Sequence, residues 1–156
     1  GKNKDNQHRL DVALNHHRSG KLQKAKTLYR KILKADPDNL DALHMLGLLL
    51  DQRGEHETAI RLFNQAIERG GESTEVYTNL GSALQSCNRI DEAITAFRQA
   101  IRINPNYILA HNNLCNALRE AGENNEEERV VRKKGIARLK SKEQSREEDS
   151  QARHTA

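Results

Sequence analysis

The sequence predicts an all-α protein built as a solenoid of antiparallel helix hairpins. Three observations support this fold class: a repeat with a 34-residue period, apolar residues spaced as on one face of a helix, and too few large apolar residues for one central core. Hydrophobic residues make up 35% of the 156 residues and aromatic residues 3%, whereas globular domains usually contain about 45–50% apolar residues. A stack of hairpins needs no single core, because each hairpin buries its apolar stripe against its neighbours.

The repeat is carried by small, aromatic and turn residues that recur together. The series at this spacing are Ala25, Ala59 and Ala93; Tyr29, Phe63 and Phe97; Leu46, Leu80 and Leu114; Gly47 and Gly81; the turn residues Gly20, Gly54, Asn88 and Gly122; and Pro37, Gly71 and Pro105. A fixed period of this size marks a repeat architecture in which each repeat is one supersecondary unit.

The expected helices follow from this register. First helices are predicted at residues 7–19, 40–53, 74–87 and 108–121, and second helices at residues 22–35, 56–69, 90–103 and 124–140. Apolar residues at i, i+3, i+4 and i+7 give the second helices one apolar stripe. Pro37 and Pro105 end the helices before them, and Asp36, Asp38 and Asn104 supply turn chemistry.

The small residues are expected to set the distances between helices. Gly47, Gly81 and Cys115 would let neighbouring first helices approach closely, and the alanine series at Ala25, Ala59 and Ala93 would do the same inside each hairpin. The aromatic residues of the second helices would then fill the remaining gap.

The pattern resembles the tetratricopeptide repeat family. The residues that carry the resemblance are Leu46, Gly47, Ala59, Phe63 and Ala66 in the second unit, and Tyr77, Leu80, Gly81, Ala93, Phe97, Ala100 and Pro105 in the third. The resemblance implies a right-handed superhelix over residues 6–140, with units at 6–39, 40–73 and 74–107. A fourth hairpin at 108–140 is expected to act as a C-terminal cap, since Glu127 and Lys134 occupy its small-residue positions.

Both ends of the chain are expected to lie outside this solenoid. Residues 1–5 begin without a methionine and are interpreted as an artificial remnant or a disordered start. Residues 141–156 contain alanine as their only hydrophobic residue type. We therefore expect a frayed helical extension that becomes disordered.

Motifs for catalysis or metal binding are absent from the sequence. It contains no phosphate-binding loop, nucleophile elbow or zinc-protease motif. His16 and His17 are adjacent on a helix and diverge by about 100°, which does not suit a shared metal ion. Cys87 and Cys115 form no C-x-x-C pair. We predict a protein that is not an enzyme and that holds no metal or cofactor.

No segment has the length and apolarity needed to cross a membrane. Runs of aliphatic residues do not exceed three, far below the ~20 residues of a membrane span. The polar residues 1–8 also lack the apolar stretch of a signal peptide. A cytoplasmic location is therefore expected.

Charge is segregated along the chain. Residues 1–35 contain ten basic and two acidic residues, residues 36–125 seven and thirteen, and residues 126–156 nine and seven. The basic stretch at 129–142 could face an anionic partner, but no aromatic residue follows Tyr107 to stack on bases, and acidic residues flank it. The basic ends are interpreted as solvated surface, so nucleic acid and anionic lipid are not expected as partners.

The first helices of such a stack line its concave side, so their inward faces form the candidate partner-binding groove. Counting in register gives four rows: Asp11, Met45, Asn79 and Asn113; Leu14, Leu48, Ser82 and Asn116; Leu10, His44, Thr78 and Asn112; and His17, Asp51, Gln85 and Arg119. The residues predicted to bind a partner are Leu10, Leu14, His44, Met45, Leu48, Asn79, Ser82, Gln85, Asn112, Asn113, Asn116 and Arg119. This groove is apolar in its N-terminal half and rich in asparagine in its C-terminal half.

Two subsets of the family bear on the groove. Asn79 and Asn113 are similar to the asparagine ladder of O-linked N-acetylglucosamine transferases, where side-chain amides hold a peptide backbone. Solvation or capping of a helix surface explains the same asparagines equally well. In the chaperone-binding subset, a lysine and an asparagine that grip a C-terminal carboxylate would stand where Leu10 and Leu14 are found. The resemblance therefore argues against that carboxylate clamp.

The function predicted from the sequence is a non-catalytic adaptor that binds a peptide or helix of another protein in the groove. Two alternatives remain open. The chain could be the substrate-recruiting part of a larger enzyme such as a glycosyltransferase, or it could associate with copies of itself through an imperfectly capped end helix.

Overall fold

The structure, a computed structural model, describes residues 2–155 of the chain. Within this range it contains seven helices and no strand: α1 (Lys2–Arg18), α2 (Leu22–Ala35), α3 (Leu40–Gln52), α4 (His56–Glu68), α5 (Thr74–Ser86), α6 (Ile90–Ile103) and α7 (Ile108–His154). The chain divides into two compact units, Gly1–Leu118 and Arg119–Ala156.

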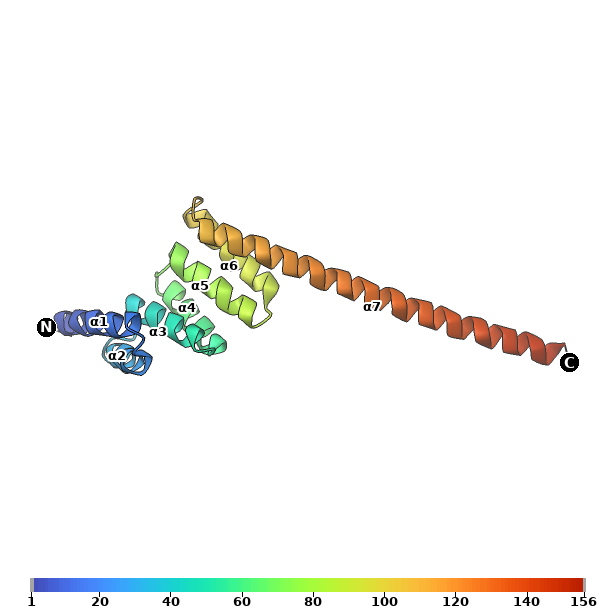
Figure 1. The fold of residues 1–156 in the computed structure, drawn as a ribbon, viewed down its shortest axis with the longest axis horizontal. Coiled ribbons are helices and arrows are strands. Elements are labelled where there is room, and N and C mark those ends of the chain that lie inside the picture. The colour runs from blue at the N-terminus through green and yellow to red at the C-terminus, as the bar shows by residue number, and fades with distance from the viewer. Residues whose placement is uncertain (1, 156) are drawn as a thin grey trace. The chain divides into compact units, whose positions relative to one another are not determined.

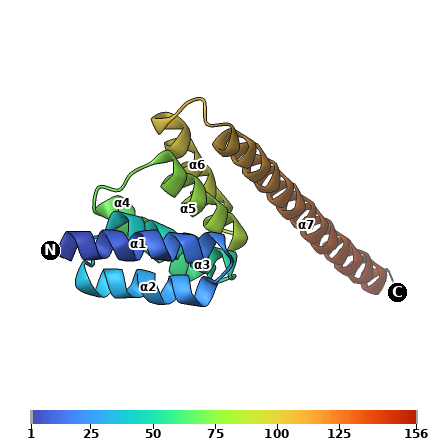
Figure 2. The same ribbon diagram turned by 60° about the vertical axis from the view of Figure 1, so that its left-hand side comes forward.

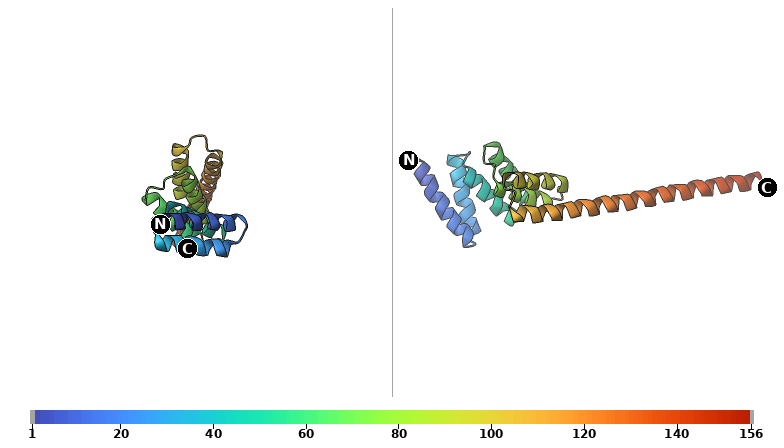
Figure 3. Two further views of the ribbon diagram at one scale, coloured as in Figure 1. Left: turned by 90° about the vertical axis from the view of Figure 1, so that its left-hand side faces the viewer. Right: turned by 90° about the horizontal axis from the view of Figure 1, so that it is seen from above.

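Helix hairpins are the building blocks of the first unit. α1 pairs with α2, α3 with α4, and α5 with α6 (Figure 1). Successive hairpins meet through α2 with α3 and α4 with α5, and the first helix α3 also contacts both α1 and α5. The rotated views show the same order of hairpins (Figures 2 and 3). The predicted all-α solenoid of antiparallel hairpins is confirmed.

The tight turns inside the three hairpins share one geometry. Each has one residue in the left-handed region, with φ of 76° at Gly20, 84° at Gly54 and 58° at Asn88. The next residue donates its N–H to a carbonyl in the last turn of the preceding helix: Lys21 to His16 at 2.8 Å, Glu55 to Leu50 at 2.8 Å and Arg89 to Leu84 at 2.9 Å. This is a Schellman ending, so the predicted turn series is confirmed at its first three positions.

Side-chain caps begin the first helices of the second and third hairpins. The Asn39 side-chain oxygen accepts from the Ala42 N–H at 2.9 Å, and the Ser73 hydroxyl oxygen accepts from the Val76 N–H at 3.1 Å. Such caps satisfy N–H groups that have no partner inside the helix. Helix ends before Pro37 and Pro105 fall as predicted, because α2 stops at Ala35 and α6 at Ile103.

The core of each hairpin surrounds one aromatic ring from its second helix. Tyr29, Phe63 and Phe97 are fully buried. A Cβ atom added at Gly47 would lie 2.7 Å from a Phe63 ring carbon, and one at Gly81 would lie 2.4 Å from a Phe97 ring carbon. The glycines therefore make room for the ring of their own hairpin. The expectation that they adjoin neighbouring first helices is corrected accordingly.

The predicted fourth hairpin at 108–140 is not formed. α7 continues as one helix of 47 residues through Gly122, where a turn was expected. Folding back would bury Glu127 and Lys134 in small-residue positions and would gain no continuous apolar stripe, whereas glutamate, lysine and arginine favour a continuing helix. The capping role assigned to residues 124–140 is therefore wrong, and α7 is a first helix without a second.

The ends of the chain also differ from expectation. α1 begins at Lys2 rather than near residue 7, and Asn6 is buried, so the described part of residues 1–5 is helical and not disordered. At the other end, residues 141–154 continue α7 with exposed side chains. Burial does not order this segment; its helix-favouring composition and the continuity of α7 account for it.

We expect Gly81→Ala to destabilise the protein by about 1–3 kcal/mol, because the new methyl group meets the Phe97 ring inside a packed core. Urea unfolding followed by circular dichroism measures the effect. The double variant Gly81→Ala/Phe97→Leu should lose less stability than the sum of its single changes, since the smaller side chain relieves the clash. Stability losses that simply add in the double variant would contradict the contact between residue 81 and the Phe97 ring. Gly135→Ala, with nothing near its added Cβ, is the matched control.

A second pair of variants tests the end of the repeat. Gly54→Ala places an alanine at a φ of 84° with no neighbour in reach, so only the backbone is strained, and a loss of about 1–2 kcal/mol is expected. Gly122 is helical, and alanine there should raise the helix content measured by circular dichroism. A comparable loss of stability in Gly122→Ala would instead indicate a turn at this residue.

Candidate functional site

The first two of the four register rows consist of half-buried or exposed side chains on the first helices. The first row is Asp11, Met45, Asn79 and Asn113, and the second is Leu14, Leu48, Ser82 and Asn116. Asp11 and Asn116 are exposed, and the other six side chains are half-buried. Because α3 contacts both α1 and α5, the rows cross consecutive helices. We call these eight residues the groove rows.

Two of the four residues in the third row are buried in the core. Leu10 is 4% exposed and Thr78 is 1% exposed, and the Thr78 hydroxyl donates to the Thr74 carbonyl at 2.7 Å. The prediction that Leu10 lines the groove is therefore wrong, because its side chain is buried in the core. His44 is half-buried in this row and Asn112 is exposed.

The fourth row includes residues bonded within or between hairpins. His17 Nδ1 lies 3.0 Å from the Tyr29 hydroxyl, and its Nε2 lies 2.8 Å from the Gln52 side-chain oxygen. An oxygen of Asp51 lies 2.6 Å from His56 Nδ1 at the start of α4. Gln85 is half-buried on α5, and Arg119 is the first residue of the second compact unit. The fourth row thus has structural partners at its first two positions.

His44 and Asn79 link two first helices at the edge of the groove rows. His44 Nε2 lies 2.9 Å from the Asn79 side-chain nitrogen, and the His44 ring meets Phe63 edge-on with centroids 6.0 Å apart. Burial lowers the pKa of His44 below its usual 6.5, while the Glu75 and Asp41 carboxylates partly oppose this shift. A neutral ring can accept the amide N–H of Asn79, so the contact ties α3 to α5.

Acidic residues beside the groove rows were missed by the sequence reasoning. Asp41 and Glu75 are exposed in the first turns of α3 and α5, and both act electrostatically on His44. They are 34 residues apart and stand three residues before His44 and Thr78. The repeat register could therefore have identified them. Together with Asp11 they add negative charge to a surface that is otherwise apolar and amide-rich.

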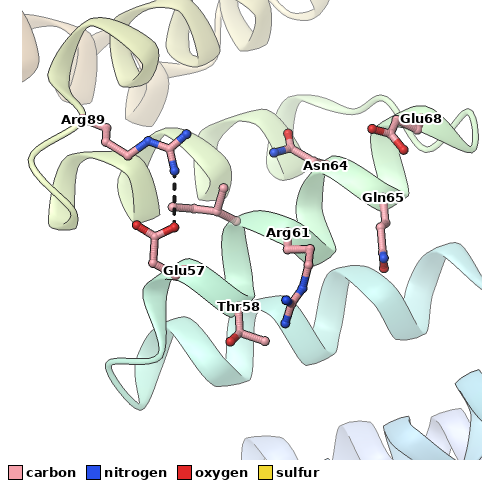
Figure 4. A pocket seen from close by; sticks show the side chains of 8 residues that line it. Glu57, Thr58, Arg61, Asn64, Gln65, Glu68 and Arg89 are labelled. Atoms are coloured by element: carbon pink, nitrogen blue, oxygen red, sulfur yellow. Dashed lines mark hydrogen bonds and ion pairs between the residues drawn. The ribbon is translucent and has the colours of Figure 1, made fainter.

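A separate depression of about 560 Å³ contains none of the predicted groove residues. Its lining comes from α4 and the start of α6, including Arg61, Asn64 and Arg89. Arg89 faces Glu57 at 3.3 Å (Figure 4) and also pairs with Glu92. The Arg89 charge is therefore already balanced by two carboxylates.

Cys87 carries no sign of activation. Burial raises the pKa of the Cys87 thiol, a hydrogen bond to Glu57 raises it further, and the nearby Arg89 opposes both only in part. Cys115 is exposed. Across the described residues, no group of three or more His, Cys, Asp or Glu side chains could hold a metal ion. Within the same range, no helix is both long and apolar enough to span a bilayer.

The fold and its register define a repeat protein of the helical solenoid class. Two family models match the sequence, one described as tetratricopeptide repeat over residues 16–86 and one as TPR repeat over residues 81–122. Between them they cover most of the three hairpins and the start of α7. The chain belongs to the tetratricopeptide repeat family.

Individual relatives resemble parts of this chain. Human tetratricopeptide repeat protein 7A is 34% identical over 58 residues, which are 37% of this chain and 7% of that protein. An O-GlcNAc transferase from Thermobaculum terrenum, solved as its K341M mutant, is 29% identical with a TM-score of 0.71, over 75% of this chain and 22% of that chain. This chain therefore spans less than a quarter of either protein.

A third likeness concerns the fold alone. The first TPR of Spaghetti (RPAP3), solved with the HSP90 peptide SRMEEVD, has a TM-score of 0.74 at 19% identity, over 76% of this chain and 94% of that chain. Nearly the whole of that domain thus superimposes on three quarters of this chain.

The His44 environment predicts a stability that depends on pH. Its pKa is lowered in the folded state, so the unfolded chain binds the proton more readily, and the free energy of unfolding should fall as the pH drops below about 6.5. Urea unfolding at neutral and mildly acidic pH measures this, and His44→Gln should reduce the loss. An NMR titration placing the His44 pKa at or above 6.5 would contradict the prediction.

Proposed function

We propose that the protein is a non-catalytic interaction scaffold that binds a peptide or helical segment of another protein across the groove rows. The observation that carries the proposal is the run of half-exposed side chains in one register on α1, α3 and α5. Residues beside them, such as Leu10, Thr78 and His17, are buried or hydrogen-bonded. The groove rows therefore keep part of each side chain accessible to a partner, even where one of them, Asn79, also bonds to His44.

The groove rows suggest the chemistry of the partner. Leu14, Met45 and Leu48 offer a partly exposed apolar surface, which suits one or two apolar side chains of a bound segment. Asn79 and Asn113 can donate to and accept from a peptide backbone, although one N–H of Asn79 already meets His44. We expect a segment that presents its backbone to the amides and its apolar side chains to the first two hairpins.

The charge of the groove rows further restricts which partner segments fit them. The groove rows contain no lysine or arginine, and Asp11, Asp41 and Glu75 supply negative charge on or beside them. A partner segment with lysine or arginine next to its apolar residues complements this surface. The acidic HSP90 peptide bound by the RPAP3 domain has the opposite charge, so we do not expect that type of ligand here.

Substrate recruitment within a larger enzyme is a second candidate function. Two observations favour it: the likeness to part of an O-GlcNAc transferase and the asparagines at positions 79 and 113 of the first groove row. Under this hypothesis the groove would hold a protein substrate for a catalytic domain elsewhere in the same polypeptide. A full-length reading frame that encodes no catalytic domain would remove this candidate and leave the scaffold function intact.

Selection from a displayed random-peptide library tests the groove. We expect the selected peptides to combine an apolar residue with lysine or arginine, and their affinity to fall about tenfold or more in Met45→Ala/Asn113→Ala, a loss of about 1.4 kcal/mol. Isothermal titration calorimetry measures the affinity. Asp41→Lys/Glu75→Lys should weaken the binding of basic peptides specifically, because the new lysines repel them.

The matched control is Arg61→Ala/Asn64→Ala on α4, which changes two side chains of the separate depression. It should leave peptide affinity unchanged. Thermal melting would confirm that each variant folds. Equal affinity of the wild type and the Met45→Ala/Asn113→Ala variant for every selected peptide would refute the groove assignment.

A further inference from the structure

The first turns of α7 occupy the position of a first helix in the repeat. Ala110 is in register with Ala42 and Val76, and Ala117 is in register with Leu49 and Ala83. All six side chains are buried. On α3 and α5 these positions belong to the packed core, and the equivalent positions of α7 are buried as well.

Another face of α7 is left uncovered. Leu118 is 43% exposed, whereas its register equivalents Leu50 and Leu84 are 1% and 5% exposed. Leu114 is only half-buried, whereas Leu46 and Leu80 are buried. In α3 and α5 these leucines flank the glycine that contacts the aromatic ring of the second helix. Within the described residues, no second helix follows α7 to cover Leu114, Cys115 and Leu118. We call these three residues the open face.

The open face lies in a segment without formal charge. Residues 108–118 contain no aspartate, glutamate, lysine or arginine, in a chain in which 31% of residues are charged. Ile108, at the start of the same segment, is 73% exposed. A charged partner would find no complement here, whereas two copies of this segment would meet without repulsion. Apolar, uncharged surfaces are typical of the buried core of homodimer interfaces.

We propose that the open face is covered by α7 of a second copy of this chain. The two α7 helices run antiparallel, as α4 runs against α3, around a two-fold axis between Leu114 and Cys115. Each Leu114 then lies over the second copy's Cys115. A two-fold interface of this kind pairs one patch with itself.

The side chain at the register position of Cys115 favours α7 of a second copy as the covering helix, rather than a helix that carries an aromatic residue as α4 and α6 do. In α3 and α5 this register position holds glycine, and a phenylalanine ring lies so close that an added Cβ atom would overlap it. In α7 the same position holds Cys115, whose side chain fills part of that space. A smaller group than an aromatic ring is therefore required opposite it, and α7 supplies leucine at the adjacent position.

The interface is small, because two helices that touch over about three turns bury less surface area than the roughly 1,200 Å² at the lower end of standard interfaces. The dimer is therefore concentration-dependent. Sedimentation equilibrium of the full chain from about 5 to about 500 µM, under reducing conditions, should show a mass that rises from monomer toward dimer. A mass that stays monomeric across this range would overturn the proposal.

Two sets of variants locate the contact. Leu118→Glu should weaken dimerisation about tenfold or more, and because Leu118 is already 43% exposed this change should not prevent folding. Val131→Glu, on a 70% exposed valine of the second compact unit, is the matched control and should leave dimerisation unchanged. The reverse result would place the contact in the second unit and overturn the proposal.

Cross-linking supplies an independent measurement. A short bismaleimide should join two wild-type chains through Cys115, because the proposed axis brings both copies of this exposed cysteine together. Cys87→Ser should retain the cross-linked dimer and Cys115→Ser should lose it. Cross-linking that persists in Cys115→Ser would show that the chains meet elsewhere.

Discussion

The contact between a buried aromatic ring and a glycine on the facing helix determines the rest of this structure. Phe63 and Phe97 are fully buried, and their ring carbons lie where a Cβ atom at Gly47 and Gly81 would have to be. The contact sets the distance between the two helices of a hairpin, and the next hairpin packs on the result. The positions of the first helices, and hence of the groove rows, follow from this packing.

The end of the repeat is explained by the loss of the same contact. α7 carries the leucines of a first helix, but the residues after Gly122 include no aromatic residue, and Glu127 and Lys134 occupy the positions where the repeat has small residues. Without that gain in burial, nothing offsets the cost of a turn and of buried charge, so the helix continues to His154. The open face is the consequence: core-type leucines at the surface of the first unit.

The candidate groove depends on interactions between first helices rather than inside hairpins. His44 on α3 meets Asn79 on α5, while Asp41 and Glu75 add negative charge nearby. These residues come from two neighbouring repeats and lie at one surface. The charge and hydrogen bonding of the groove therefore depend on both repeats and not on either one alone. A scaffold of this kind can keep its packing residues unchanged while its surface rows vary, which separates stability from binding specificity.

The hairpin architecture follows from the sequence alone, since glycine turns, proline stops and a 34-residue register act locally and repeat. The predicted helices at 22–35 and 90–103 coincide with α2 and α6. Which inward positions stay exposed depends instead on how the helices pack: Leu10 is buried, Met45 is half-exposed, and His44 is bonded to Asn79. The physical reason is that adjacent helical positions differ by about 100° in direction, so a small change in helix packing moves a residue from groove to core. Whether residues 124–140 fold back was likewise decided by packing energy, because their helix propensity allows both outcomes.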